Sequence, residues 1–123
     1  MNMEAHEKKF EDALVKELER RMVFCHHFDA IGCDGWPDLL LLKNNRCLLV
    51  ECKYNTLALR KDQEAFRVLL HSRYGFDQHV VAVKRPNGYV IVLDGGNDMI
   101  PCASMAQLVE LLIGLMGINW GAH

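Results

Sequence analysis

The spacing of apolar residues predicts where the chain is helical. From about 5 to 22, apolar side chains recur every three or four residues with charged residues between them, which is typical of an amphipathic helix. The same spacing recurs over 60–74, ahead of Gly75, and the predominantly apolar segment 104–116 is a third candidate. Ser104 and Gln107 form a capping-box pattern at the start of the last segment. The chain is therefore expected to hold three helices.

Short apolar runs between these helices predict strands at 23–28, 38–43, 47–54, 79–84 and 89–94. Polar turns at 44–46 and 86–88 separate two pairs of runs, and their Asn and Gly residues tolerate the positive φ that tight hairpins require. The element order is α-β-β-β-α-β-β-α. It predicts an α/β fold in which helices flank a mixed central sheet.

The composition narrows the class of protein. The chain has 123 residues, of which 50% are hydrophobic and 24% charged, as expected for a single globular domain over 1–123. The net charge of −2 gives no bulk electrostatic reason to bind nucleic acid, although it leaves local basic patches possible. No apolar stretch approaches the roughly 20 residues that cross a bilayer. The charged N-terminus does not resemble a signal peptide, so we expect no membrane contact and a cytoplasmic location.

The five cysteines form no C-x-x-C pair, and an odd number favours reduced thiols over a disulfide framework. A zinc site made from Cys25, His26, His27 and Cys33 is an alternative use of two of them, but its spacing is unlike that of structural zinc sites.

The first predicted hairpin brings charged side chains together. With a two-residue loop at 44–45, Asp38 lies opposite Glu51 on one face of the strand pair. Lys53 shares that face, because side chains alternate along a strand. A three-residue loop would shift this register by one. Both faces are otherwise apolar, which favours an internal position where charges are costly unless they are paired or bind a metal.

These residue types suit phosphodiester chemistry. Two facing carboxylates can bind a hard divalent cation such as Mg²⁺, which prefers oxygen ligands. The cation neutralises a phosphodiester oxygen and acidifies a bound water, and a neighbouring lysine can orient or deprotonate that water or stabilise developing charge. The structural alternative is a salt bridge between Lys53 and Asp38 or Glu51.

The first helix offers a third carboxylate. Glu11 falls inside the apolar stripe, where an acid is unexpected unless the site it faces requires one. Glu7 lies one turn earlier on the same side; alternatively, it remains in solvent and interacts favourably with the positive end of the helix dipole.

Together these motifs resemble the PD-(D/E)xK nuclease superfamily, which has a restriction-endonuclease-like sheet. The resemblance rests on Pro37-Asp38 and Glu51-Cys52-Lys53 after a helix that carries Glu11, and it extends over about 7–94. Gly35-Trp36-Pro37-Asp38 and the glutamine of 59–63 are similar to the virus-type replication-repair nuclease (VRR-NUC) branch. Residues 10–18 are similar to the first helix of phage and archaeal Holliday-junction resolvases.

The resemblance implies a role for each matching residue. Asp38, Glu51 and the Cys52 backbone carbonyl would bind Mg²⁺ or Mn²⁺, and Lys53 would be the catalytic lysine. Either Glu11 or Glu7 would be the helix acid, acting directly or through water. Gln63 would orient metal-bound water or the phosphate, or would cap its helix. We expect Arg60 and Lys61 to contact DNA, and Trp36 to stack on a base or pack under its loop.

The implied function is that of a small, metal-dependent DNA endonuclease without an organic cofactor, in a bacterial or phage-infected cell. Its expected substrate is branched DNA of the Holliday-junction type. The alternatives are a catalytically inactive module that binds DNA or protein, and a nuclease with nonspecific, restriction-like or RNA-directed activity.

The segment 104–116 is apolar nearly all round, and a helix of this kind must be buried on most sides. A homodimer interface is the simplest explanation, and burial within one monomer is the alternative.

Overall fold

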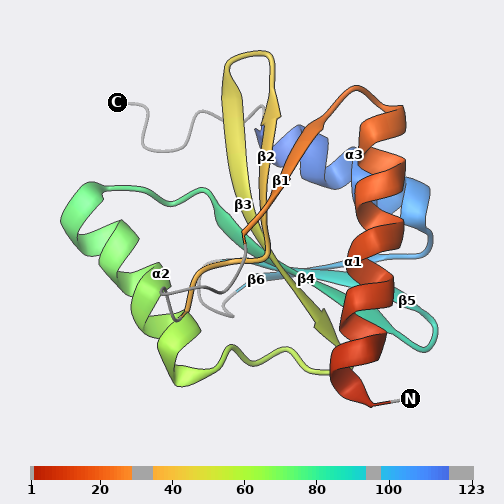
Figure 1. The fold of residues 1–123 in the computed structure, drawn as a ribbon, viewed down its shortest axis with the longest axis horizontal. Coiled ribbons are helices and arrows are strands. Elements are labelled where there is room, and N and C mark those ends of the chain that lie inside the picture. The colour runs from red at the N-terminus through yellow and green to blue at the C-terminus, as the bar shows by residue number, and fades with distance from the viewer. Residues whose placement is uncertain (1, 29–34, 94–97, 117–123) are drawn as a thin grey trace.

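The computed structural model describes residues 2–28, 35–93 and 98–116. Within these residues the chain forms three helices and one six-stranded sheet (Figure 1). In chain order, the elements are α1 (Met3–Arg20), β1 (Phe24–His27), β2 (Leu39–Lys43), β3 (Arg46–Tyr54), α2 (Lys61–Tyr74), β4 (His79–Arg85), β5 (Gly88–Leu93), β6 (Asp98–Cys102) and α3 (Met105–Met116).

The strands lie in the sheet in the order in which they occur in the chain. All neighbouring pairs are antiparallel except β3 and β4, which run parallel. Parallel neighbours need a long crossover, and the segment containing α2 supplies it. The predicted α/β fold with a mixed central sheet flanked by helices is confirmed.

One strand, β6, was missing from the predicted order. It is five residues long, has no alternating pattern and contains Pro101. Proline cannot donate a hydrogen bond to a neighbouring strand, so within sheets it is confined largely to edge strands, and β6 is the edge strand next to β5. The pairing with β5 creates this strand, and the local sequence does not reveal it.

The predicted register of the β2–β3 hairpin is confirmed. Asn44 and Asn45 both have positive φ, 52° and 66°, as a two-residue turn of type I′ requires. The ladder runs from Lys43 opposite Arg46 to Leu39 opposite Val50. Asp38 therefore lies one residue before the strand, at the position that continues the ladder opposite Glu51.

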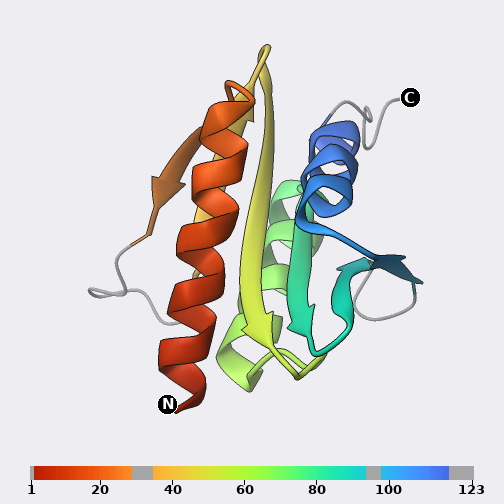
Figure 2. The same cartoon turned by 90° about the vertical axis from the view of Figure 1, so that its right-hand side faces the viewer.

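The main core lies between one face of the sheet and two helices. Leu14 and Leu18 of α1 are fully buried there against Leu48 and Val50 of β3. Each such leucine contributes about 1.5–3 kcal/mol of hydrophobic free energy. Figure 2 shows α1 alongside β3, with α3 on the same side of the sheet.

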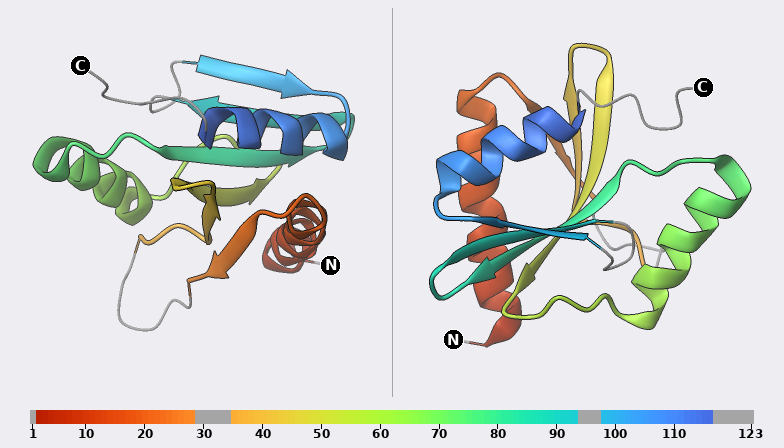
Figure 3. Two further views of the ribbon diagram at one scale, coloured as in Figure 1. Left: turned by 90° about the horizontal axis from the view of Figure 1, so that it is seen from above. Right: turned by 180° about the vertical axis from the view of Figure 1, so that it is seen from behind.

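The other face of the sheet carries α2, opposite α1 and α3 (Figure 3). A smaller apolar cluster, built on Val81, Val83 and Val92, lies on this face. Leu42 is exposed near the hairpin turn. The expectation that both faces of the hairpin are fully covered is therefore wrong at this end, because the single helix α2 packs against the other end of β3.

The last helix, α3, buries much of its apolar surface inside the chain. Half of its predicted capping box forms, since Ser104 Oγ accepts from the Gln107 N–H at 3.2 Å. The return bond differs from the prediction, because Gln107 Oε1 accepts from the Ala103 N–H at 2.7 Å, one residue before Ser104. Leu111 and Ile113 are only half-buried. No helix among the described residues is long and apolar enough to cross a membrane.

Candidate active site

The candidate site begins where the chain enters β2. The Asp38 carboxylate accepts a hydrogen bond from the backbone N–H of Cys52, with an Oδ2–N distance of 2.7 Å. This bond fixes Asp38 against β3 across the end of the hairpin ladder. Gly35, three residues earlier, has φ of 86° and packs so closely on the first turn of α2 that a Cβ would overlap the Asp62 carbonyl.

This close approach gives a testable consequence. We expect Gly35→Ala to destabilise the fold by about 1–3 kcal/mol, since the residue would be strained in its backbone and would push the loop away from α2. Gly114→Ala is the matched control. It lies in α3 with open space around an added Cβ, so it should stabilise the helix by about 0.5–1 kcal/mol. Urea unfolding measures both, and equal effects of the two variants would contradict this account of Gly35.

Glu51 is held from the opposite side by α2. Its side chain is 3% exposed, and Gln63 donates from Nε2 to Glu51 Oε1 at 2.7 Å. Gln63 Oε1 also accepts from the Arg60 backbone N–H at 2.9 Å, at the start of α2. Gln63 therefore caps its helix and also contacts Glu51, while its expected role in orienting metal-bound water or the phosphate stays a prediction.

The surroundings of Glu51 disfavour its negative charge. Burial raises the pKa of Glu51 far above its ordinary value, and a hydrogen bond and repulsion from the Asp38 carboxyl raise it further. Nearby positive charges on Lys53 and Arg60 oppose this shift only in part. A divalent cation between the two carboxyl groups would relieve the repulsion, so the residues present fit the metal that the sequence motifs imply.

Lys53 lies on the same face of β3 as Glu51 and is also buried. Its ammonium is close enough to lower the pKa of both Glu51 and Glu7. Asp38, Glu51, Lys53 and Gln63, which are separated by up to 25 residues in the sequence, thus converge at the carboxyl end of β3.

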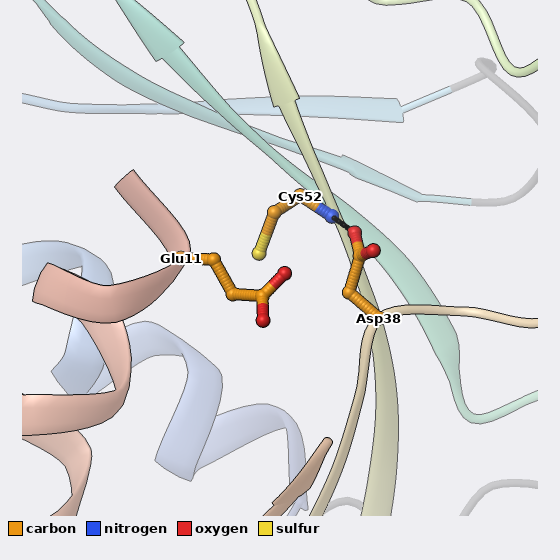
Figure 4. Close-up of side chains that lie close together, drawn as sticks. All are labelled: Glu11, Asp38 and Cys52. Atoms are coloured by element: carbon orange, nitrogen blue, oxygen red, sulfur yellow. Dashed lines mark hydrogen bonds between the residues drawn. The ribbon is translucent and has the colours of Figure 1, made fainter. Parts of the chain in front are cut away.

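Glu11 reaches the same region from α1. It is only 9% exposed, as its place in the apolar stripe predicts, and burial raises its pKa. One carboxylate oxygen of Glu11, one of Asp38 and the Cys52 thiol sulfur lie within 4.8 Å of one another (Figure 4). Glu7 is half-buried one turn away, where Lys53 and Asp38 influence its pKa. Both candidate helix acids therefore face the site, and Glu11 lies in the cluster of possible ligands.

His27 is a site neighbour that the sequence motifs did not reveal. Its Nδ1 is hydrogen-bonded to Glu11 Oε2 at 2.8 Å. The sequence placed His27 in a predicted strand, but only the structure shows that this strand pairs with β2, where His27 lies opposite Leu39, the residue after Asp38. His26 points to the other face of β1 and contacts Phe28, so it does not join Cys25 and His27 as the zinc alternative required. Cys33 lies outside the described residues.

The three residues expected to bind DNA differ in their exposure and in their distance from the site. Trp36 packs between Phe28 and Phe66, with ring centroids at 4.9 and 5.3 Å, yet remains 40% exposed. Arg60 lies near enough to lower the pKa of Glu51, whereas Lys61 is exposed on the adjoining surface of α2. Trp36 therefore packs under its loop and still offers part of its ring to a ligand.

A solved structure shares this architecture. It is the structure of Archaeoglobus fulgidus Hjc, a Holliday junction resolvase from an archaeal hyperthermophile. The match covers 85% of this chain and 98% of the resolvase chain. The TM-score is 0.58 and the sequence identity 19%. The chain has the fold of this resolvase. No protein-family model and no curated protein matches the sequence. The resolvase fold agrees with the restriction-endonuclease-like sheet expected from the motifs.

Proposed function

We propose that the chain is a divalent-metal-dependent DNA endonuclease that hydrolyses phosphodiester bonds. The observation that carries this proposal is the convergence of two hydrogen-bonded carboxyl groups, Asp38 and Glu51, with the buried Lys53 at the end of β3. Buried charged groups are rare unless function or pairing requires them.

Each residue has a defined task in this function. Asp38, Glu51 and the Cys52 backbone carbonyl would hold Mg²⁺ or Mn²⁺, which supplies charge neutralisation for the phosphate and acidifies a bound water. Gln63 fixes the Glu51 carboxylate through its 2.7 Å hydrogen bond. The Lys53 ammonium stabilises the charge that develops on the phosphate oxygens, or exchanges a proton with the attacking water. Glu11 or Glu7 completes the acidic environment from α1.

The proposed substrate is branched DNA of the Holliday-junction type. The resolvase fold and the motifs similar to VRR-NUC nucleases support it. Arg60 and Lys61, beside the site, would bind phosphates without reading sequence, and the exposed part of the Trp36 ring would stack on an unpaired base.

A homodimer suits this substrate, since two active sites related by a two-fold axis match a symmetric four-way junction. The proposed interface is α3, where the half-buried Leu111 and Ile113 leave apolar surface for a partner. This surface is smaller than the sequence pattern suggested, because α3 directs most of its apolar residues into its own chain.

The test is cleavage of a DNA panel with Mg²⁺ or Mn²⁺: a four-way junction, a flap, a single strand and a linear duplex. Wild type is compared with Asp38→Asn and with Asp12→Asn, a matched change at an exposed residue of α1. We expect metal-dependent cleavage of the junction that Asp38→Asn abolishes and Asp12→Asn retains.

Other results would select the alternatives. Equal cleavage of all substrates would keep the nuclease and discard the junction preference in favour of a nonspecific or restriction-like activity. Tight, metal-independent DNA binding with no cleavage would indicate the catalytically inactive module.

A further inference from the structure

The buried thiol of Cys52 makes no hydrogen bond within the described part of the chain. Cys52 is 1% exposed, and Figure 4 shows its Sγ directed towards the Glu11 carboxylate. The other described thiols each donate a hydrogen bond, Cys25 to Val23 O, Cys47 to Gln78 Oε1 and Cys102 to Ile100 O. Over the described ranges, Cys52 Sγ makes no such bond. A buried polar group without a partner, aimed at an acidic side chain, points to a missing ligand.

This thiol belongs to a set of three donors from three elements. Sγ of Cys52 on β3, a carboxylate oxygen of Glu11 on α1 and one of Asp38 before β2 lie within 4.8 Å of one another. Sulfur is a poor ligand for Mg²⁺, which takes oxygen donors, whereas Zn²⁺ and similar soft cations bind thiolate together with carboxylate or imidazole.

We propose that Glu11, Asp38 and Cys52 form a second metal site, which takes a thiophilic divalent cation such as Zn²⁺ or Cd²⁺ and inhibits the enzyme. The inhibition rests on the proposed nuclease function, but the binding does not. The cation replaces the thiol proton, which leaves to solvent, and forms a metal–sulfur bond. His27 orients the Glu11 carboxylate from outside the cluster, as residues around metal ligands commonly do.

The two sites exclude each other because they share Asp38. The catalytic cation would use Asp38 with the Cys52 carbonyl and with Glu51, which lies on the side of β3 that faces α2, while the helix acid approaches from α1. The thiophilic cation would use Asp38 with side chains on the side of α1. Alternation along β3 separates these sides, since Cys52 Sγ and the Glu51 carboxylate project from opposite faces of the strand. A cation bound through Cys52 therefore removes an essential ligand from the catalytic position.

The test is a titration of the reduced, metal-free protein with Cd²⁺ in excess Mg²⁺, followed by the ultraviolet charge-transfer absorption of the cadmium–thiolate bond. We expect one tight binding event in wild type. Cys52→Ser removes that absorption, and Glu11→Gln, which keeps the thiol, weakens binding by about 10–100-fold. Cys47→Ser is the matched control, because it removes another thiol of the same strand and should leave the event intact.

An absorption change that persists in Cys52→Ser and disappears in Cys47→Ser would overturn the proposal. So would an affinity unchanged by Glu11→Gln in a protein that unfolds at the wild-type urea midpoint. Zn²⁺ inhibition of DNA cleavage is then measured with wild type, Cys52→Ser and Cys47→Ser, each normalised to its own activity in Mg²⁺. Glu11→Gln is used for the binding measurement alone, because Glu11 is a candidate ligand of the catalytic cation. Cadmium binding at Cys52 without any cleavage of DNA would keep the second metal site and reject the nuclease, so the two failures are distinguishable.

Discussion

Replacing Lys53 with alanine is expected to lower the rate of metal-dependent DNA cleavage by about 10²–10⁴-fold. The reason is the position of the ammonium, which is buried beside Glu51 and close enough to influence the pKa of two acids at the site. A charge fixed in a site that excludes water stabilises a developing negative charge far better than one in solvent. Single-turnover cleavage, with DNA binding measured separately, separates loss of chemistry from loss of affinity.

Lys84→Ala is the matched control for this variant. Lys84 lies on the neighbouring strand β4, where it pairs with Tyr54 and packs over the ring of Tyr89 at 5.0 Å. The substitution removes the same charge from the opposite face of the sheet, so cleavage should change little. A similar loss in both variants would mean that net charge and DNA affinity, rather than the position of Lys53, determine the rate.

The parts of the site that depend on local backbone geometry could be predicted from the sequence. Two adjacent asparagines with positive φ fix a two-residue turn, and the turn fixes which residues pair along β2 and β3. The proximity of Asp38 and Glu51 follows from that register. Glu11 could be predicted for a similar reason, because the helical period places it on the face that α1 buries.

The contacts that depend on packing between elements could not be predicted. The pairing of β1 with β2 brings His27 to Glu11, and an exposed four-residue edge strand carries too little pattern to reveal that pairing. The approach of Cys52 Sγ to Glu11 depends on how α1 is rotated against β3. Gln63 shows the intermediate case: its helix-start position was clear, but its bond to Glu51 depends on where α2 lies relative to β3, which the local sequence does not reveal.

Glu51→Gln is expected to stabilise the metal-free protein at pH 8 while abolishing metal-dependent cleavage. At pH 8 the fold must either bury this charge or keep protonated a carboxyl that is ionised in the unfolded chain, and glutamine avoids both costs. We therefore expect a gain in unfolding free energy of at least about 2 kcal/mol. Glutamine keeps the shape of the side chain and an oxygen that can accept from Gln63 Nε2. The direction of the pH dependence of stability follows from the raised pKa of Glu51 in the folded state. Its protonated form stabilises the fold below the ordinary value of 4.5, and this contribution is lost as the pH rises towards the higher folded pKa.

Urea unfolding at pH 5 and pH 8, with and without Mg²⁺, checks this expectation. The advantage of Glu51→Gln over wild type should be larger at pH 8 than at pH 5, and Mg²⁺ should stabilise wild type but not the variant. Glu110→Gln is the control, since it makes the same change at an exposed residue whose ion pair with Arg21 is worth little. If wild type and Glu51→Gln are equally stable at both pH values, Glu51 does not carry a disfavoured charge. The repulsion between Asp38 and Glu51 would then no longer support a cation site between them.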